Sequence, residues 1–265
     1  MKFMRSASKQ LFATLLVVVI SLPFVLLVLL SMARSWRYPA LWPQSWQSTQ
    51  WTVFQDEWQT LALIALRSLA LAVSVATLAT VAGFFTSHGL ARQRQQGPWL
   101  ALALLPFAVP PLVYGLCLGQ GFAALAFSGH YGGVVLAQWP CAYGYAVLIC
   151  HGYWTPHHHA LGELAAGLGA RPTQIGWRVH LPLARGLLGV CLFQTALMSW
   201  FDFALVRVIG AGRVQTLTLT VFDYLAAGDV RQAASAALLL LAPPALALLI
   251  APRLLRPAPW WRPSP

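Results

Sequence analysis

Three consecutive histidines, His157, His158 and His159, are the densest group of potential metal ligands in the sequence. Imidazole nitrogens bind zinc and other transition metals, usually together with further His, Cys or acidic ligands. Successive residues of a helix point about 100° apart, so one helix cannot aim all three rings at a single ion. No cysteine or acidic residue is interleaved with them. We therefore expect no metal site here, and we expect the histidines to lie on the solvated side of a short helix.

Few other polar side chains stand where chemistry could occur. Asp202 lies near the end of an apolar run, and an ionisable group at membrane depth is a candidate for solute contact or for a salt bridge that fixes helix packing. Tyr114 and Gln138 lie inside apolar runs, where they could contact a solute or form hydrogen bonds between helices. The four cysteines have apolar neighbours and no CxxC spacing, so we expect buried apolar roles for them.

The composition indicates which class of protein carries these side chains. Of the 265 residues, 58% are hydrophobic and only 9% are charged, whereas soluble domains are about 25% charged. The net charge of +11 is dispersed among apolar segments, which argues against a nucleic-acid partner and favours a membrane protein. Six apolar runs reach the roughly 20 residues that span a bilayer as a helix. They are residues 11–32, 61–87, 99–127, 133–153, 183–206 and 233–250.

The distribution of basic residues predicts the orientation. With the N-terminus inside, 11 of the 17 Lys and Arg residues fall on the inner side, as the positive-inside rule requires. We predict a multi-pass protein of the bacterial inner membrane with both termini in the cytoplasm. Residues 1–60 then form the first span and an outer connection rich in tryptophan, typical of an interfacial belt. Residues 61–253 form the core with five spans, and residues 254–265 form a short basic tail.

The third run contains the stretch LPFAVPPLVYGL, in which Pro106, Pro110 and Pro111 each remove a backbone donor. Broken helices survive in lipid only where protein or a wet cavity satisfies the freed carbonyls. We expect this helix to line a cavity, and a static kink is the alternative. Pro106, Pro110, Tyr114 and Asp202 are therefore our candidates for a translocation path.

Residues 68–83 of the second run are rich in small side chains, which predicts close packing inside a helix bundle.

The segment 155–183 interrupts the apolar runs on the expected cytoplasmic side. Thr155 and Pro156 can begin a helix that Gly169 ends, and Pro172 can begin a second helix that Leu181 and Pro182 end. Two helices of this length are too short to span a membrane and lack a wide lipid-binding face. We expect them to dock into another protein.

This segment resembles the EAA loop of binding-protein-dependent ABC importer permeases. The loop has the pattern E-A-A, three residues, G, nine residues, I, one residue, L-P. Leu164 replaces the middle alanine and Val179 replaces the isoleucine. The residues at matching positions are Glu163, Leu164, Ala165, Gly169, Val179, Leu181 and Pro182. The stretch LPFAVPPLVYGL of the third run and residues 200–238 are similar to the sulfate, molybdate, thiamine and iron(III) permease group, although Phe201-Asp202-Phe203 stands where Gly-Glu-Phe or Gly-Glu-Tyr is common.

The resemblance implies an all-α, six-helix permease of type I (MetI-like), whose EAA loop forms coupling helices on a cytoplasmic ATPase. It implies as partners two ABC ATPase subunits, a second permease subunit, identical or homologous, an extracytoplasmic solute-binding protein and membrane lipids. The chain has no GxxxxGK[ST] phosphate loop, so we expect no enzymatic activity and no bound cofactor; ATP and Mg would bind the partner ATPase. Glu163 would pair with a basic residue of that ATPase.

Two alternatives remain from the sequence. A stand-alone secondary transporter could use the broken third run and Asp202 as a midplane site, although the sequence has no evident inverted repeat. An integral-membrane enzyme could use the three histidines with a metal. The sequence leaves the transported solute open among inorganic oxyanions, ferric iron, thiamine and polyamine-like solutes.

Overall fold

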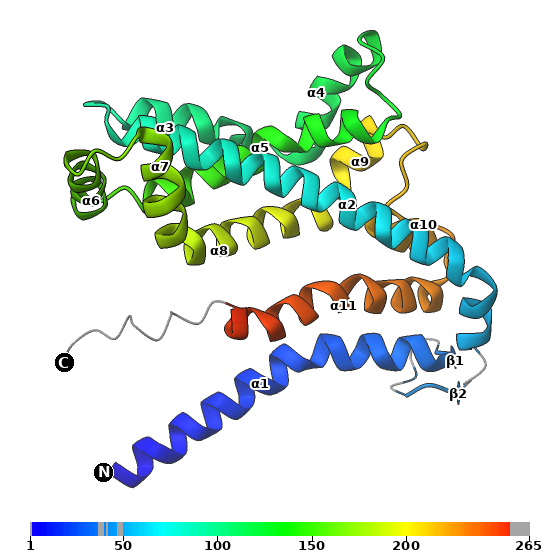
Figure 1. Ribbon diagram of the computed structural model, residues 1–265. Helices are drawn as coiled ribbons and strands as arrows, with labels where there is room; N and C mark the ends of the chain where they lie inside the picture. The colour runs from blue at the N-terminus through cyan, green and yellow to red at the C-terminus, as the bar shows by residue number, and fades with distance from the viewer. Residues whose placement is uncertain (1, 37–39, 41, 47–49, 255–265) are drawn as a thin grey trace. The chain divides into compact units, whose positions relative to one another are not determined.

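The computed structural model describes residues 2–36, 40, 42–46 and 50–254 (Figure 1). The chain divides into two compact units, one formed by Met1–Leu63 and Leu217–Ala245, the other by Ile64–Thr216 and Leu246–Pro265. The expected basic tail, from residue 255 onward, lies outside the described residues, as does the side chain of Trp51.

The first unit contains helix α1 and a short pair of strands. Helix α1 spans Lys2–Met32, and its apolar side chains from Phe12 to Val25 are exposed, as is usual for a helix made to face lipid. Strand β1 (Ala33–Ser35) pairs antiparallel with β2 (Ser45–Trp46). The unit also holds α10 (Leu217–Ala226), the start of α2 and most of α11.

The second unit holds the rest of the helices, and with them both the loop 155–183 and the candidate translocation-path residues. Helix α2 (Gln50–Ala91) and helix α11 (Val230–Leu254) continue into it from the first unit. Its other elements are α3 (Gly97–Leu104), η1 (Leu105–Ala108), α4 (Pro111–Ala124), α5 (Tyr131–His151), α6 (Pro156–Gly167), α7 (Pro172–Ile175), η2 (Gly176–His180), α8 (Leu181–Trp200) and α9 (Ala204–Ile209). Helix α5 is central, because it packs against α3, α8 and α9.

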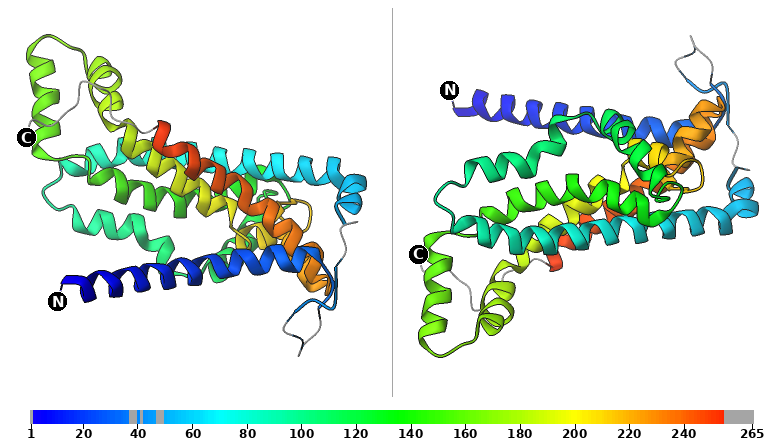
Figure 2. Two further views of the ribbon diagram at one scale, coloured as in Figure 1. Left: turned by 90° about the horizontal axis from the view of Figure 1, so that it is seen from below. Right: turned by 90° about the horizontal axis from the view of Figure 1, so that it is seen from above.

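Small side chains set the distance between α2 and its neighbours. One stripe of α2 at helical spacing is buried. It consists of Ser68, Leu71, Ala72, Val75, Ala76, Ala79, Thr80 and Gly83. Thr80 lies beside Thr195 of α8, with 3.4 Å between their hydroxyl oxygens. Gly83 lies against Ala146 of α5, and Figure 2 shows the two helices side by side. The predicted packing of the segment 68–83 is confirmed.

Gly83→Ala is expected to destabilise the fold by about 1–3 kcal/mol, because overpacking forces the helices apart. A Cβ at this position would lie 2.7 Å from the Ala146 Cβ and 2.9 Å from its carbonyl carbon. Gly89→Ala is the matched control on the same helix, since a Cβ there meets nothing within 4 Å. Thermal unfolding of both variants in detergent would measure the difference. Equal melting temperatures would show that the α2–α5 contact is not close-packed.

The described residues contain five helices long and apolar enough to span a membrane, within Phe12–Met32, Trp58–Ala91, Tyr131–His151, Pro172–Trp200 and Val230–Ile250. A sixth candidate is the pair Gly97–Ala108 and Pro111–Ala124, which is bent by 91°. The predicted all-α membrane fold is confirmed, with the third run broken as expected. Pro106 stands in η1 and Pro111 at the start of α4, while Val109 between them is extended, because a residue before proline disfavours helix.

Two sequence predictions, on the end of the second loop helix and on the cysteines, were wrong. Leu181 and Pro182 do not end the second loop helix, since α7, η2 and α8 run as one helix from Pro172 to Trp200. The segment η2 is a π-helix in which the Leu181 N–H bonds the Gly176 carbonyl, and this wider turn places Pro182 in the first turn of α8. The cysteines are not all buried either. Cys150 and Cys191 are, but Cys141 is half-buried and Cys117 is exposed.

Candidate functional site

The loop between α5 and α8 begins with α6, whose ends are defined by local sequence. Thr155 occupies the N-cap position before Pro156, although its hydroxyl lies 2.9 Å from the His158 Nδ1 and does not cap the backbone. At the other end Gly169 has φ +85°, a conformation that favours glycine. The Gly169 N–H donates to the Ala166 carbonyl and the Ala170 N–H to the Ala165 carbonyl, the paired bonds of a Schellman motif. The expected end of this helix is confirmed.

Helix α7 and η2 form the second half of the loop and pack against α6 (Figure 1). The Arg171 backbone N–H donates to the Gln174 side-chain oxygen at 2.9 Å, which satisfies one free donor at the start of α7. Ile175 and Val179 are half-buried on one side of the turn. The sequence therefore forms a pair of short helices with a defined turn between them.

This helix pair exposes large apolar side chains. Leu164 is 66% exposed, Leu168 is 91% exposed and Trp177 is 71% exposed. Glu163 is exposed beside them. Of the other pattern residues, Gly169 and Pro182 are exposed, while Ala165, Val179 and Leu181 are half-buried. Exposed apolar groups rimmed by charge mark surfaces that bind other molecules. The role of each pattern residue in docking stays a prediction.

The expectation that the three histidines lie on the solvated side of α6 was wrong for two of them. His157 is exposed, but His158 and His159 are half-buried. The His158 ring stacks on Tyr153 with 4.2 Å between ring centroids, and the His159 ring lies 5.8 Å from Trp154. In the described part of the chain, no three His, Cys, Asp or Glu side chains are placed to hold a metal ion.

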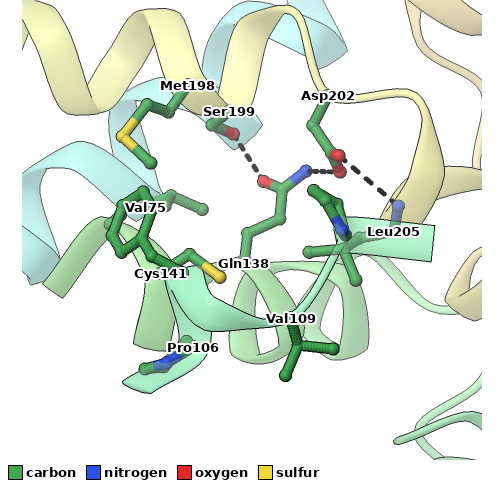
Figure 3. A pocket seen from close by; sticks show the side chains of 12 residues that line it. Val75, Pro106, Val109, Gln138, Cys141, Met198, Ser199, Asp202 and Leu205 are labelled. Atoms are coloured by element: carbon green, nitrogen blue, oxygen red, sulfur yellow. Dashed lines mark hydrogen bonds between the residues drawn. The ribbon is translucent and has the colours of Figure 1, made fainter. Parts of the chain in front are cut away.

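A cavity of about 160 Å³ lies at the break of the third run (Figure 3). Its walls come from η1 and the start of α4, from α5, from the end of α8 and start of α9, and from Val75 of α2. The lining residues are Val75, Pro106, Phe107, Val109, Pro111, Gln138, Cys141, Ala142, Met198, Ser199, Asp202 and Leu205. Backbone breaks in α3–α4 and in α8–α9 thus face one cavity, as expected for non-helical backbone at membrane depth.

A chain of hydrogen bonds crosses one wall of this cavity (Figure 3). The Ser199 hydroxyl donates to the Gln138 amide oxygen at 2.5 Å, and the Gln138 amide nitrogen donates to the Asp202 carboxylate at 2.7 Å. The other Asp202 oxygen accepts from the Leu205 backbone N–H at 3.4 Å, near the start of α9. Gln138 and Ser199 are buried, with 4% and 5% exposure. The network ties the α8–α9 break to α5.

The four path candidates are placed differently with respect to the cavity. Pro106 and Asp202 line it, whereas Pro110 and Tyr114 are not among its lining residues. Gln138 completes the site, although the sequence only marked it as a polar residue in an apolar run. Whether any of these groups contacts a solute stays a prediction.

Fold and composition together define the class of protein. The chain is an all-α, multi-pass membrane protein with a protruding pair of short helices and a cavity at a broken span. It is similar to the molybdenum transport system permease protein ModB of Mycobacterium bovis and to that of Mycobacterium tuberculosis, each at 30% identity over 156 residues. These matches cover 54% of this chain and 56% of each relative, so the chain spans about half the length of the curated relatives it matches. No protein-family model matches the chain. The predicted resemblance to this group of permeases is confirmed.

Proposed function

We propose that the chain is the transmembrane subunit of an ATP-binding-cassette importer. It forms half of a translocation path, a second permease subunit forms the other half, and two cytoplasmic ATPases bind ATP and Mg and supply the energy. A solute-binding protein delivers the solute from the outer side of a bacterial inner membrane, and both termini lie in the cytoplasm. The chain itself hydrolyses no ATP.

The helix pair α6 and α7–η2 carries this proposal. It combines the EAA spacing with exposed Leu164, Leu168 and Trp177 and an exposed carboxylate at Glu163. Such a surface suits a groove in another protein, because burying it removes apolar area from water and pairs the carboxylate with a basic group. A second support is the similarity to two permeases named for molybdenum transport. Molybdate is therefore the first solute to assay.

The test is reconstitution of the chain with its ATPase and solute-binding protein in vesicles. ATP-dependent uptake that requires both partners would support the proposal. Uptake without the ATPase, driven by an ion gradient, would favour the stand-alone transporter.

Glu163→Lys is expected to abolish stimulation of ATP hydrolysis by the solute-binding protein, while the chain still inserts into the membrane. Reversing the charge puts a cation against the basic residue that we propose on the ATPase. Breaking a desolvated pair of this kind costs about 2–5 kcal/mol of association. His157→Lys is the control, because it also places a lysine at an exposed position, but on another face of α6. Full stimulation in Glu163→Lys would exclude a docking role for this carboxylate.

A further inference from the structure

Seven ring-bearing residues and one serine meet where the end of α2 lies against the loop helices. They are Phe84, Ser87 and His88 of α2, Tyr153 and Trp154 just after α5, His158 and His159 of α6, and His180 of η2. We call this set the imidazole–aromatic cluster. Three helices (α2, α6 and η2) and the connection after α5 contribute to it, and none of its members lines the cavity described above.

Trp154 holds the cluster to α2. Its indole N–H donates to the Ser87 hydroxyl at 2.9 Å, and both residues are buried. The Trp154 ring lies 4.2 Å from the His88 ring and 5.1 Å from the Phe84 ring, measured between centroids. Since a buried indole N–H requires an acceptor, this hydrogen bond fixes how the residue after α5 sits on α2.

The loop helices reach the same point from the other side. The His159 ring stacks on His88 at 6.0 Å with 22° between the ring planes. The His180 ring lies 5.0 Å from Trp154, and the Tyr153 hydroxyl lies 3.4 Å from both the His180 Nδ1 and its carbonyl oxygen. Burial raises the pKa of the Tyr153 hydroxyl to about 12, so it keeps its proton and can donate to that carbonyl at neutral pH. Both α6 and η2 thus contact α2 or its partner Trp154.

These contacts matter because α2 is not adjacent to the loop helices along the chain. The loop is joined directly to α5 and α8, but residues 92–151 separate α2 from it along the chain. Force on α6 reaches α2 directly only through side-chain contacts such as these. Rigid rings at close-packed distance, fixed by a buried hydrogen bond, transmit displacement with little compression.

We propose that the imidazole–aromatic cluster is the joint that carries movement of the coupling helices to α2, with Ser87, His88 and Trp154 as positioning residues for transport. This inference rests on the proposed function, and it adds α2 to the elements that the ATPase moves. Loosening the joint should therefore separate ATP hydrolysis from solute movement without preventing assembly.

The test uses Ser87→Ala and Trp154→Phe in the reconstituted complex, with solute uptake and ATP hydrolysis measured together. Both substitutions remove the same hydrogen bond and keep most of the packing. We expect stimulated ATP hydrolysis to persist and the uptake per ATP to fall about tenfold in each single variant. The double variant should show no further fall, because the two residues act through one bond. Thr86→Ala is the matched control, since the Thr86 hydroxyl is exposed and bonds only its own helix at Ala82.

The outcomes separate the inference from the proposed function. If the wild-type complex shows no ATP-driven uptake, the proposed function fails and this inference fails with it. If the wild type transports and both single variants keep its uptake per ATP, only the inference is overturned. Should Trp154→Phe fail to assemble, Ser87→Ala and His159→Ala decide the question. A parallel loss of hydrolysis and uptake in those two variants would also overturn the inference, because it would indicate a structural role.

Discussion

Gly169→Val is expected to abolish stimulated ATP hydrolysis in the assembled complex while leaving the membrane helices folded. Gly169 has φ +85°, and a β-branched residue held there costs on the order of 1–3 kcal/mol. The variant would relieve this strain by changing the turn and losing the bonds from Gly169 to Ala166 and from Ala170 to Ala165. The angle between α6 and α7 would then change. Since the two helices are proposed to enter one groove together, their docking would fail.

The loss should come from the backbone and not from side-chain bulk. A Cβ at Gly169 meets no atom within 4 Å, so there is no clash to relieve. Gly169→Asn should keep much of the stimulation, because asparagine tolerates positive φ better than other residues. Gly169→Asp should keep less, since a carboxylate is unfavourable at a helix C-terminus. Gly167→Ala is the control, because this position in α6 is exposed, a Cβ there would meet no atom within 4 Å, and its φ is not positive. Equal activity in all four variants would exclude a role for the turn.

Sequence alone was enough for features that depend on local physics. The apolar runs predicted the membrane helices, because few segments outside a bilayer are both so long and so poor in charged residues. The proline-rich stretch predicted the break between α3 and α4, since proline removes donors wherever it stands. Gly169 likewise predicted the end of α6, because a helix end of this kind depends only on the backbone conformation that glycine allows at that residue.

The errors arose where an unusual local turn or contacts between residues far apart in the sequence decide the outcome. Proline at the start of α8 suggested a helix end, but a π-helical turn absorbs it, and its i→i+5 bonding has no simple sequence signal. The placement of His158 and His159 depends on Tyr153 and Trp154 folding back onto α2, which helical spacing cannot reveal. The partner of Asp202 is Gln138, 64 residues earlier in the chain, and only the packing of α5 on α8 brings them together.

Gln138→Leu is expected to give the largest loss at the cavity, in both stability and uptake. It removes the acceptor of the buried Ser199 hydroxyl and the amide that donates to the Asp202 carboxylate. Each buried polar group left without a partner costs about 1–3 kcal/mol, and more where the group is charged. Gln120→Leu is the matched control, because Gln120 is exposed on α4 and lies outside the cavity lining. The melting temperature in detergent and ATP-driven uptake would be measured for both variants.

The double variant Gln138→Leu with Asp202→Leu separates a path role from a packing role. Replacing both members of a buried polar pair by apolar groups is far less costly than removing one, so most of the lost stability should return. We expect uptake to stay low in this double variant, because the cavity would keep its shape and lose the carboxylate and amide that a hydrated solute would meet. Recovery of uptake together with the melting temperature would instead assign Gln138 and Asp202 to helix packing alone.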